Sequence, residues 1–282
     1  MEELFHIQGS IPVMRDSVPI RFVHHKNLDR PESHVLHINN YLELYVYVQG
    51  NHKYIVENRL YELRRGDIIL INPREVHKAL PLELCLYERF YLLLDADCFR
   101  GLSYDPLSYI LGQLPRVGNL ISPPEEAREQ VLQLLYAISG CVARSQVQAL
   151  GLVLQLLAVC AGQMQGANGE PGPIAPVPEL LEQILSYVAR NTASLQSTQQ
   201  IAQALGLTPQ YLSTYFRRHI GTPLKIYIQA KKIALAKDLL DKGADVTGAC
   251  FDSGFNDCSY FIRVFKKYVG VTPLNYRRSL RK

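Results

Sequence analysis

The sequence FRRHIGTP, from Phe216 to Pro223, recurs further along the chain as FKKYVGVTP, from Phe265 to Pro273. In both copies a phenylalanine and a basic pair are followed by a glycine and a Thr-Pro step. An apolar residue four positions before each phenylalanine, Leu212 or Phe261, would lie on the same helix face. The repeat therefore predicts that one helical supersecondary unit occurs twice.

The first copy carries the signals of a helix, a glycine turn and a second helix. Ser197 and Gln200 are spaced as a capping box at the start of a short apolar helix, and Gly206 suits the tight turn after it. Thr208 and Pro209 then begin the second helix with an N-cap and a proline at the first helical position. Its outer face is the surface that a recognition helix presents to the major groove. The residues that we expect to face DNA here are Gln210, Ser213, Thr214, Arg217 and Arg218.

The second copy starts at Val246 and turns at Gly254, and we expect Asn256 to cap its second helix. In that helix Phe261 would point inward. Arg263 would point outward, where it could bind a guanine through two hydrogen bonds or hold a phosphate. The residues that we expect to face DNA in this copy are Cys258, Ser259, Ile262, Arg263, Lys266 and Lys267.

A single helix of about 18 residues is predicted between the copies, from Thr222-Pro223 to Asp241. At ~1.5 Å per residue it is ~27 Å long, which would place the two recognition helices about one turn of B-DNA apart. Charge agrees with this interpretation. The chain from residue 179 onward has 15 Lys and Arg against 7 Asp and Glu, whereas the rest has 15 against 19. Clustered basic residues predict a polyanionic partner, although a helical bundle with a solvated basic face would show the same charges.

These motifs resemble the DNA-binding domain of the AraC/XylS family of transcription regulators over residues 195 to 278. The resemblance implies two helix-turn-helix subdomains joined by one long helix, and activation of transcription near RNA polymerase. There are two departures: Ala249-Cys250 replaces the usual Ile-Ala pair in the second subdomain, and Lys232 replaces a common arginine in the helix that links the subdomains. The matching residues are Ile201-Ala202, Gly206, Leu212 to Phe216, Ala236, Leu239-Leu240, Gly254-Phe255, Tyr260-Phe261, Val264 to Lys267, Gly270, Thr272-Pro273 and Tyr276-Arg277.

Residues 10 to 100, in contrast, are typical of strands. Alternating or β-branched runs occur at Tyr41 to Gln49, Lys53 to Glu57, Asp67 to Ile71 and Leu84 to Leu94, separated by turn sequences. This region resembles the cupin-like sensor domain found before the same DNA-binding domain in many family members. The mouth of such a barrel is a natural site for a small molecule. The matching residues are His37, Glu43-Leu44, Gly50, Leu63, Gly66 to Ile71, Pro73 and His77.

The resemblance implies an effector that is a sugar or another small metabolite. The candidate ligand-binding residues are His37, Asn39, Glu43, Tyr45 and His77, with Tyr47 as an alternative aromatic wall. His24, His25 and His34 are instead expected at the surface of strands or loops. Glu43, Tyr45 and Tyr47 would share one strand face, and the two tyrosines fit core packing equally well. Metal-binding cupins place a histidine where this chain has Asn39, so we expect no metal and no other cofactor.

No catalytic Ser-His-Asp or Cys-His arrangement, P-loop or dinucleotide fingerprint is apparent, so we expect no enzyme. Two rival hypotheses remain: a metal-dependent cupin enzyme with an appended DNA-binding domain, and a regulator that binds no ligand and is controlled by its abundance. The six cysteines lack C-x-x-C spacing, and the N-terminal residues MEELFHIQGS contain no apolar signal-peptide core. The apolar run from Leu150 to Ala161 is shorter than the ~20 residues that span a bilayer. We therefore expect a cytoplasmic protein without a membrane partner.

The fold class that follows is an α+β multidomain chain, in which an all-β cupin-like barrel with two C-terminal helices of its own precedes an all-α domain. The expected divisions are a ligand-sensing domain at 1–120, a helical dimerisation segment at 121–165, a Gly/Pro-rich linker at 166–178 and a double helix-turn-helix domain at 179–282. Val131, Leu135 and Ile138 recur at helical spacing in the second division, 121–165. Its apolar stripes predict a homodimer, or alternatively packing within one chain.

Overall fold

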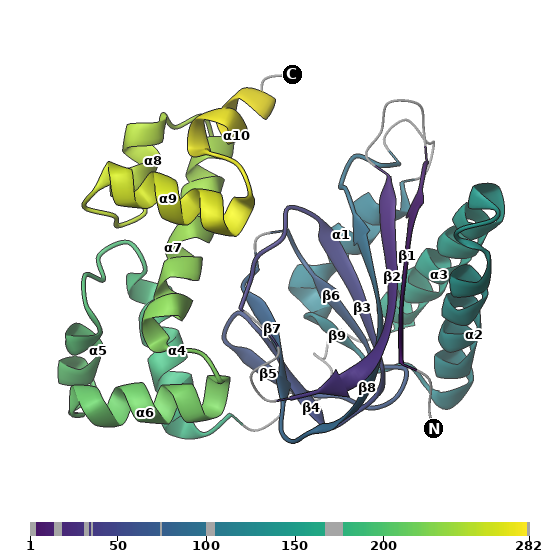
Figure 1. Cartoon of the computed structure of the whole chain (residues 1–282), viewed down its shortest axis with the longest axis horizontal. Helices are drawn as coiled ribbons and strands as arrows, with labels where there is room; N and C mark the ends of the chain where they lie inside the picture. Colours follow the sequence, from purple (N-terminus) through teal and green to yellow (C-terminus); the bar gives the residue numbers. More distant parts are fainter. Residues whose placement is uncertain are drawn as a thin grey trace.

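A computed structural model of the chain describes residues 4–13, 19–30, 34, 36–73, 75–99, 105–166 and 177–280. Two antiparallel sheets form its first half (Figure 1). The larger sheet has the strand order β1-β2-β8-β3-β6-β9, and the smaller one has the order β5-β4-β7. The strands are β1 Phe5–Ile11, β2 Ile20–Asp29, β3 Leu42–Gln49, β4 His52–Val56, β5 Arg59–Glu62, β6 Ile68–Ile71, β7 His77–Pro81, β8 Cys85–Leu94 and β9 Leu120–Ile121.

Strand β3 shows how the larger sheet separates two environments. Leu42, Leu44 and Val46 point to one face and belong to an apolar core shared with helices α1 (Pro106–Val117), α2 (Glu125–Cys141) and α3 (Gln146–Gly166). Tyr45 and Tyr47 point to the other face, between the two sheets. The predicted period-2 alternation is therefore present, and the helices cover the outer face of the larger sheet (Figure 1).

Helix α3 is longer than the apolar run from which it was predicted. Its stretch Gln146–Gln165 has a mean hydropathy of 1.7 and is long and apolar enough to cross a membrane, so the expectation that this segment is too short was wrong. One side of the helix is buried in the sensor-domain core through residues such as Val153 and Leu157. Such burial is ordinary for a core helix of a globular domain.

The second half of the chain is entirely helical in its described residues. Helices α5 and α6 form the first predicted unit and α8 and α9 the second, at opposite ends of the long helix α7 (Figure 1). The predicted capping box at Ser197 and Gln200 and the N-cap at Thr208 are both formed. The helices are α4 Glu179–Asn191, α5 Thr198–Ala204, α6 Pro209–Ile220, α7 Leu224–Asp241, α8 Val246–Asp252, α9 Cys258–Val269 and α10 Pro273–Ser279.

The halves share one hydrophobic cluster. One buried cluster contains Tyr227 of α7 together with Ile55 and Leu80 of the smaller sheet. Ile38, in the loop before β3, belongs to it as well. The outer face of the smaller sheet is therefore covered by the helical domain, as Figure 1 shows.

The cap of α9 and the number of separate elements in the first half differ from the prediction. Asp257 caps α9, because its carboxylate accepts hydrogen bonds from the backbone of Ser259 and Tyr260, so Asn256 is not the cap. Strands β1, β2, β5 and β7 and helix α1 were not predicted as separate elements. Most of the expected linker at 166–178 lies outside the described residues.

Gly254, in the turn between α8 and α9, gives a test of the packing between the two helix-turn-helix units. Its φ is +88°, and an added Cβ would lie 2.2 Å from the carbonyl oxygen of Ala193. Gly243 has a similar φ of +97° but open space around it. We expect Gly243→Ala to cost about 1 kcal/mol through backbone strain alone, and Gly254→Ala about 1–3 kcal/mol more through the clash. Urea unfolding followed by circular dichroism measures both, and equal losses would contradict the described packing.

Candidate functional site: nucleic-acid interface and sensor pocket

Helix α6 presents a polar surface of the kind that enters a major groove. Its apolar side is buried through Leu212, Phe216 and Ile220. All the predicted DNA-facing residues of this helix are exposed, namely Gln210, Ser213, Thr214, Arg217 and Arg218. Tyr211, which was not predicted from the sequence to face DNA, is 51% exposed beside them. An aromatic ring at the start of a recognition helix can contact a thymine methyl group or the sugar-phosphate backbone.

Helix α9 presents a matching surface. Phe261 and Phe265 are buried, and the guanidinium of Arg263 lies 5.9 Å from the ring centre of Tyr260. The exposed residues include Ser259, Ile262, Arg263, Lys266 and Lys267, whereas Cys258 is only half-exposed. The sequence thus predicted which side of α9 is outward, although it placed Cys258 further into solvent than the structure does.

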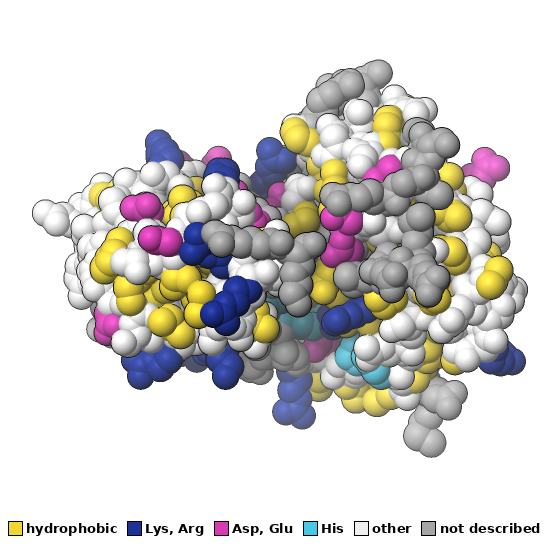
Figure 2. Space-filling view, turned by 90° about the horizontal axis from the view of Figure 1, so that it is seen from above, with side chains coloured by type: hydrophobic (Ala, Val, Ile, Leu, Met, Phe, Trp, Pro, Cys, Tyr) yellow, Lys and Arg dark blue, Asp and Glu magenta, His cyan; other side chains and the backbone are white. Residues whose placement is uncertain are grey.

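Helix α7 sets the spacing of these two surfaces. Its 18 residues span ~27 Å and separate units of similar construction. Lys232, one of the departures from the family pattern, is buried and its ammonium donates to the carbonyl oxygen of Gly254 at 2.5 Å. A lysine therefore joins α7 to the turn of the second unit. In the space-filling view, Lys and Arg side chains occur mainly on the helical half of the molecule (Figure 2).

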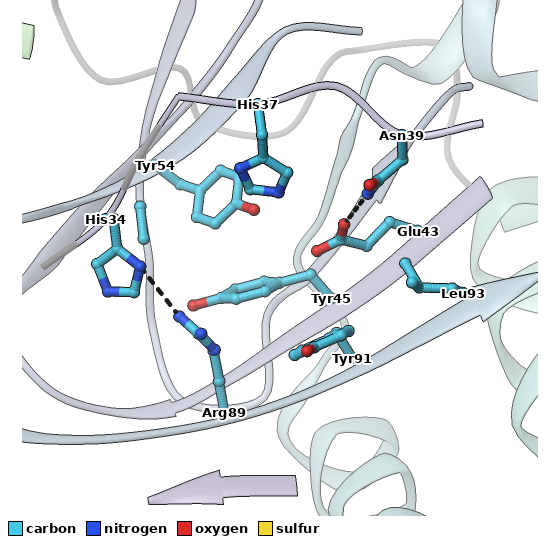
Figure 3. A pocket seen from close by; sticks show the side chains of 10 residues that line it. His34, His37, Asn39, Glu43, Tyr45, Tyr54, Arg89, Tyr91 and Leu93 are labelled. Atoms are coloured by element: carbon cyan, nitrogen blue, oxygen red, sulfur yellow. Dashed lines mark hydrogen bonds between the residues drawn. The ribbon is translucent and has the colours of Figure 1, made fainter. Parts of the chain in front are cut away.

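A cavity of about 360 Å³ lies between the two sheets of the first half. Strands β3, β4, β7 and β8 and the loop before β3 supply its walls (Figure 3). Four of the five predicted ligand residues line it directly. The lining residues are His34, His37, Asn39, Glu43, Tyr45, Tyr54, Ala79, Arg89, Tyr91 and Leu93.

One wall of the cavity holds a buried acid with polar neighbours. Asn39 and His77 both contact one carboxylate oxygen of Glu43. The amide nitrogen of Asn39 lies 2.5 Å from this oxygen, and His77 Nε2 lies 3.3 Å from it. Burial raises the pKa of Glu43, but the hydrogen bond and charge of His77 outweigh it and leave the pKa lowered. For His77 the two effects have opposite signs. Burial lowers its pKa, but the hydrogen bond and charge of Glu43 outweigh burial and raise the pKa above its ordinary value. The two groups thus form an ion pair, and His77 belongs to the site without lining the cavity.

The opposite wall holds Arg89 and His34, which were not predicted from the sequence as pocket residues. Arg89 enters from β8 between Tyr87 and Tyr91, with its guanidinium 4.9 Å and 5.8 Å from their ring centres. His34, expected to be a surface residue, lies beside it with Nδ1 at 3.5 Å from the Arg89 guanidinium. The signal available in the sequence was the alternation in β8, which places Tyr87, Arg89 and Tyr91 on one face.

Asp29 connects this wall to the interior. Its carboxylate oxygen lies 2.6 Å from His34 Nε2 and 2.8 Å from His52 Nε2. Burial and the charge of Arg89 lower the pKa of His34 to about 4, despite the opposing effect of Asp29. Both imidazoles are therefore neutral donors to one buried carboxylate at pH 7. His24, also expected at the surface, is buried against Glu88 at 2.8 Å.

Two groups of side chains carry metal-ligand atoms at suitable distances: His37, Glu43 and His77, and Asp29, His34 and His52. In the first group the second ring nitrogen of His77 lies 2.8 Å from the carbonyl oxygen of Glu75, an arrangement typical of metal-bound histidine. In the second group the other nitrogen of His34 faces a guanidinium, which can only donate. The second set is thus a poor cation site, and the first has three donors of the usual four.

Comparison with known proteins agrees with this geometry. A family model described as a helix-turn-helix domain matches residues 201–279, and one described as an AraC-like ligand binding domain matches residues 23–97. The chain belongs to the AraC family of transcription regulators. This AraC-family regulator therefore combines a ligand-binding domain and a DNA-binding domain, as its sequence predicted, and its partners include DNA and a small-molecule effector.

Two curated transcriptional activators support the same assignment. The transcriptional activator RhaR of Escherichia coli O6:K15:H31 is 24% identical over 86% of this regulator and 86% of its own length. The transcriptional activator RhrA of Rhizobium meliloti is 27% identical over 52% of this regulator and 49% of its own length, so that match spans about half of RhrA. Among solved structures, ToxT of Vibrio cholerae is 18% identical over 91% of this chain and 97% of its own, with a TM-score of 0.39.

The contacts of Asp29 with His34 and His52 predict that the stability of the fold depends on pH. The folded-state pKa of His34, about 4, lies below the ordinary value of 6.5, so the unfolded chain binds more protons between these values. Stability is therefore lost as the pH falls through this window. We expect His34→Asn to remove about 1 kcal/mol of the loss between pH 6.5 and 5.5. Urea midpoints measured against pH give the slopes, and parallel curves for parent and variant would refute the assignment.

Proposed function

We propose that this regulator is a cytoplasmic, homodimeric transcription activator in which the sensor pocket controls the DNA-binding domain through strand β7, with RNA polymerase as a further partner. The observation that carries the proposal is the alternation of β7. His77 and Ala79 face the pocket side, whereas Lys78 between them faces the helical domain. A change at the pocket would therefore move a residue that contacts the DNA-binding half.

Lys78 is held at the C-terminal end of recognition helix α6. Its ammonium donates to the carbonyl oxygens of Ile220 and Gly221 at 3.2 and 3.1 Å, and to the hydroxyl oxygen of Thr222 at 3.0 Å. Burial lowers the pKa of Lys78 to about 8. A cation at this position also interacts favourably with the negative end of the helix dipole. The contact thus fixes α6 relative to the sensor domain.

Further contacts connect α7 to the same face. The hydroxyl of Tyr227 donates to the carbonyl oxygen of Glu57 at 3.0 Å, and Lys231 forms an ion pair with the Glu57 side chain. Lys237 donates to Asn40, next to the pocket residue Asn39. An effector shifts the regulator toward activity only if it binds one arrangement more tightly than the other. These contacts are what would differ between the two arrangements.

We assign a function to each part of the chain: sensing to residues 1–120, dimerisation to 121–165, a linker to 166–178 and DNA binding to 179–282. For dimerisation, α2 and α3 retain exposed apolar side chains after packing on the sheet, with Tyr136 at 42%, Val147 at 86% and Leu154 at 38% exposure. Sedimentation velocity should give the mass of two chains for the parent and of one chain for Leu154→Arg. A monomeric parent would favour packing within one chain as the sole role of these helices.

Lys78→Met tests the coupling, and Lys53→Met is its matched control. Lys53 projects from the adjacent strand β4 and pairs with Glu62 of the sensor domain at 2.7 Å. We expect Lys78→Met to speed amide hydrogen exchange at the corner between α6 and α7 several-fold, because three hydrogen bonds to that corner are lost. Lys53→Met should leave the same amides unchanged.

In cells, Lys78→Met should also reduce the difference between the active and idle outputs of a promoter fusion. Unchanged exchange in Lys78→Met, or an equal change in Lys53→Met, would contradict coupling through β7.

Base recognition is tested by Thr214→Ala and Arg263→Ala, with Arg278→Ala as an exposed basic control on α10. We expect each recognition-helix variant to lose ~1–3 kcal/mol of binding at one or a few base positions, because a base-edge contact is removed. Binding to selected and random duplexes gives the specificity. A uniform loss across sequences would reassign the residue to phosphate contact, and no loss for either residue would contradict the proposed interface.

A further inference from the structure

We propose that the effector is a small hydroxylated carboxylic acid whose carboxylate is bound by Arg89, with its hydroxyl groups on the wall formed by Asn39 and Glu43. This inference rests on the proposed function of the pocket as the effector site and names the chemical class of its ligand. It starts from the arrangement of charges around the cavity (Figure 3).

Arg89 lines the cavity, and among the described residues no carboxylate forms an ion pair with it. Its guanidinium donates to the hydroxyl of Tyr87 at 3.2 Å and faces the imidazole of His34 at 3.5 Å. Its Nε is buried without a hydrogen bond, and no carboxylate of the described residues lies within 4.0 Å of its nitrogens. An unsatisfied buried donor costs free energy, and a carboxylate that accepts from two guanidinium nitrogens would satisfy it.

The acids of the pocket are already engaged. Glu43 forms its ion pair with His77, and Asn39 donates to the same carboxylate. Asp29 is in contact with the imidazoles of His34 and His52, and His34 lies between its carboxylate and the guanidinium. Neither acid can reach Arg89 without giving up a buried partner. The missing negative charge therefore has to come with the ligand.

The guanidinium is also fixed in place. Tyr87 and Tyr91 flank it on the same strand face, and the hydroxyl groups of Tyr45 and Tyr87 lie 2.6 Å apart. A planar guanidinium held between aromatic rings is suited to two parallel hydrogen bonds with a carboxylate. A lysine at this position would offer a point charge without that geometry.

The rest of the cavity limits what the acid can carry. Asn39, Glu43 and His37 lie across the pocket from Arg89 in Figure 3, and offer donors and acceptors that suit hydroxyl groups. Tyr45, Tyr54 and Tyr91 supply flat apolar walls. The volume of about 360 Å³ is near the lower end of small-molecule sites, which favours a compact ligand. A neutral sugar would leave Arg89 without an anion, and a simple fatty acid would place apolar carbons against the polar wall of Asn39 and Glu43.

The test compares matched neutral and acidic probes by isothermal titration calorimetry on the full chain without DNA. The pairs are glucose with glucuronate, galactose with galacturonate, and glycerol with glycerate, with acetate as an acid that lacks hydroxyl groups. We expect at least one hydroxylated acid to bind saturably and its neutral partner to bind at least about 10-fold more weakly. Acetate should bind more weakly than that acid.

Variants locate the binding. Arg89→Met should weaken the best acid about 10- to 100-fold, and Arg89→Lys should restore part of the affinity. Arg21→Met, an exposed arginine on β2, should bind like the parent. Circular dichroism and the melting temperature establish that each variant is folded, and Asn39→Ala gives a second probe of the site by weakening glucuronate-type acids but not acetate.

Binding of no acid, equal binding of neutral partners, or undiminished binding by folded Arg89→Met would overturn the inference. Because the titration contains no DNA, such a failure would leave DNA-binding regulation standing. Conversely, a failure to bind operator DNA would leave a measured acid site in place.

Discussion

The ammonium of Lys78 joins the two halves of the molecule at one point. It is buried between the smaller sheet and the end of α6, and its three hydrogen bonds go to Ile220, Gly221 and Thr222. A buried lysine without a carboxylate is stable only if every donor is satisfied, so the corner between α6 and α7 must keep its geometry around this residue. The neighbouring side chains of β7 face the pocket. Strand alternation alone thus places the cavity and helix α6 on two sides of one strand.

Helix α7 imposes the second constraint. Because it is a single helix of 18 residues, the distance between the two recognition helices is set by its length rather than by a flexible linker. Lys232 fixes the far unit through the carbonyl oxygen of Gly254, while Tyr227 and Lys231 contact the sensor domain. The same helix therefore sets the distance between α6 and α9 and also carries contacts to the sensor domain.

The helical half was largely predictable from sequence, because its signals are local. Capping residues such as Ser197 and Thr208, glycine turns and the repeated Phe-basic-basic pattern act within a few residues of one another. The pocket was predictable only in part. Glu43 and Tyr45 follow from alternation in one strand, whereas Arg89 and His34 meet them only because β8 pairs beside β3 and a loop returns to the cavity. Long-range pairing of this kind leaves no local mark, and for the same reason buried His24 was expected at the surface.

Because α7 holds the outer faces of α6 and α9 at a fixed distance, we expect one chain to bind two adjacent major-groove segments. Selection of genomic DNA fragments by the purified protein, in moderate salt with competitor and then across a salt series, tests it most directly. We expect enrichment of sites with two conserved blocks about one helical turn, ~34 Å, apart, with affinity that falls as salt rises. Absence of enrichment, both for the protein alone and with cell metabolites added, would contradict it.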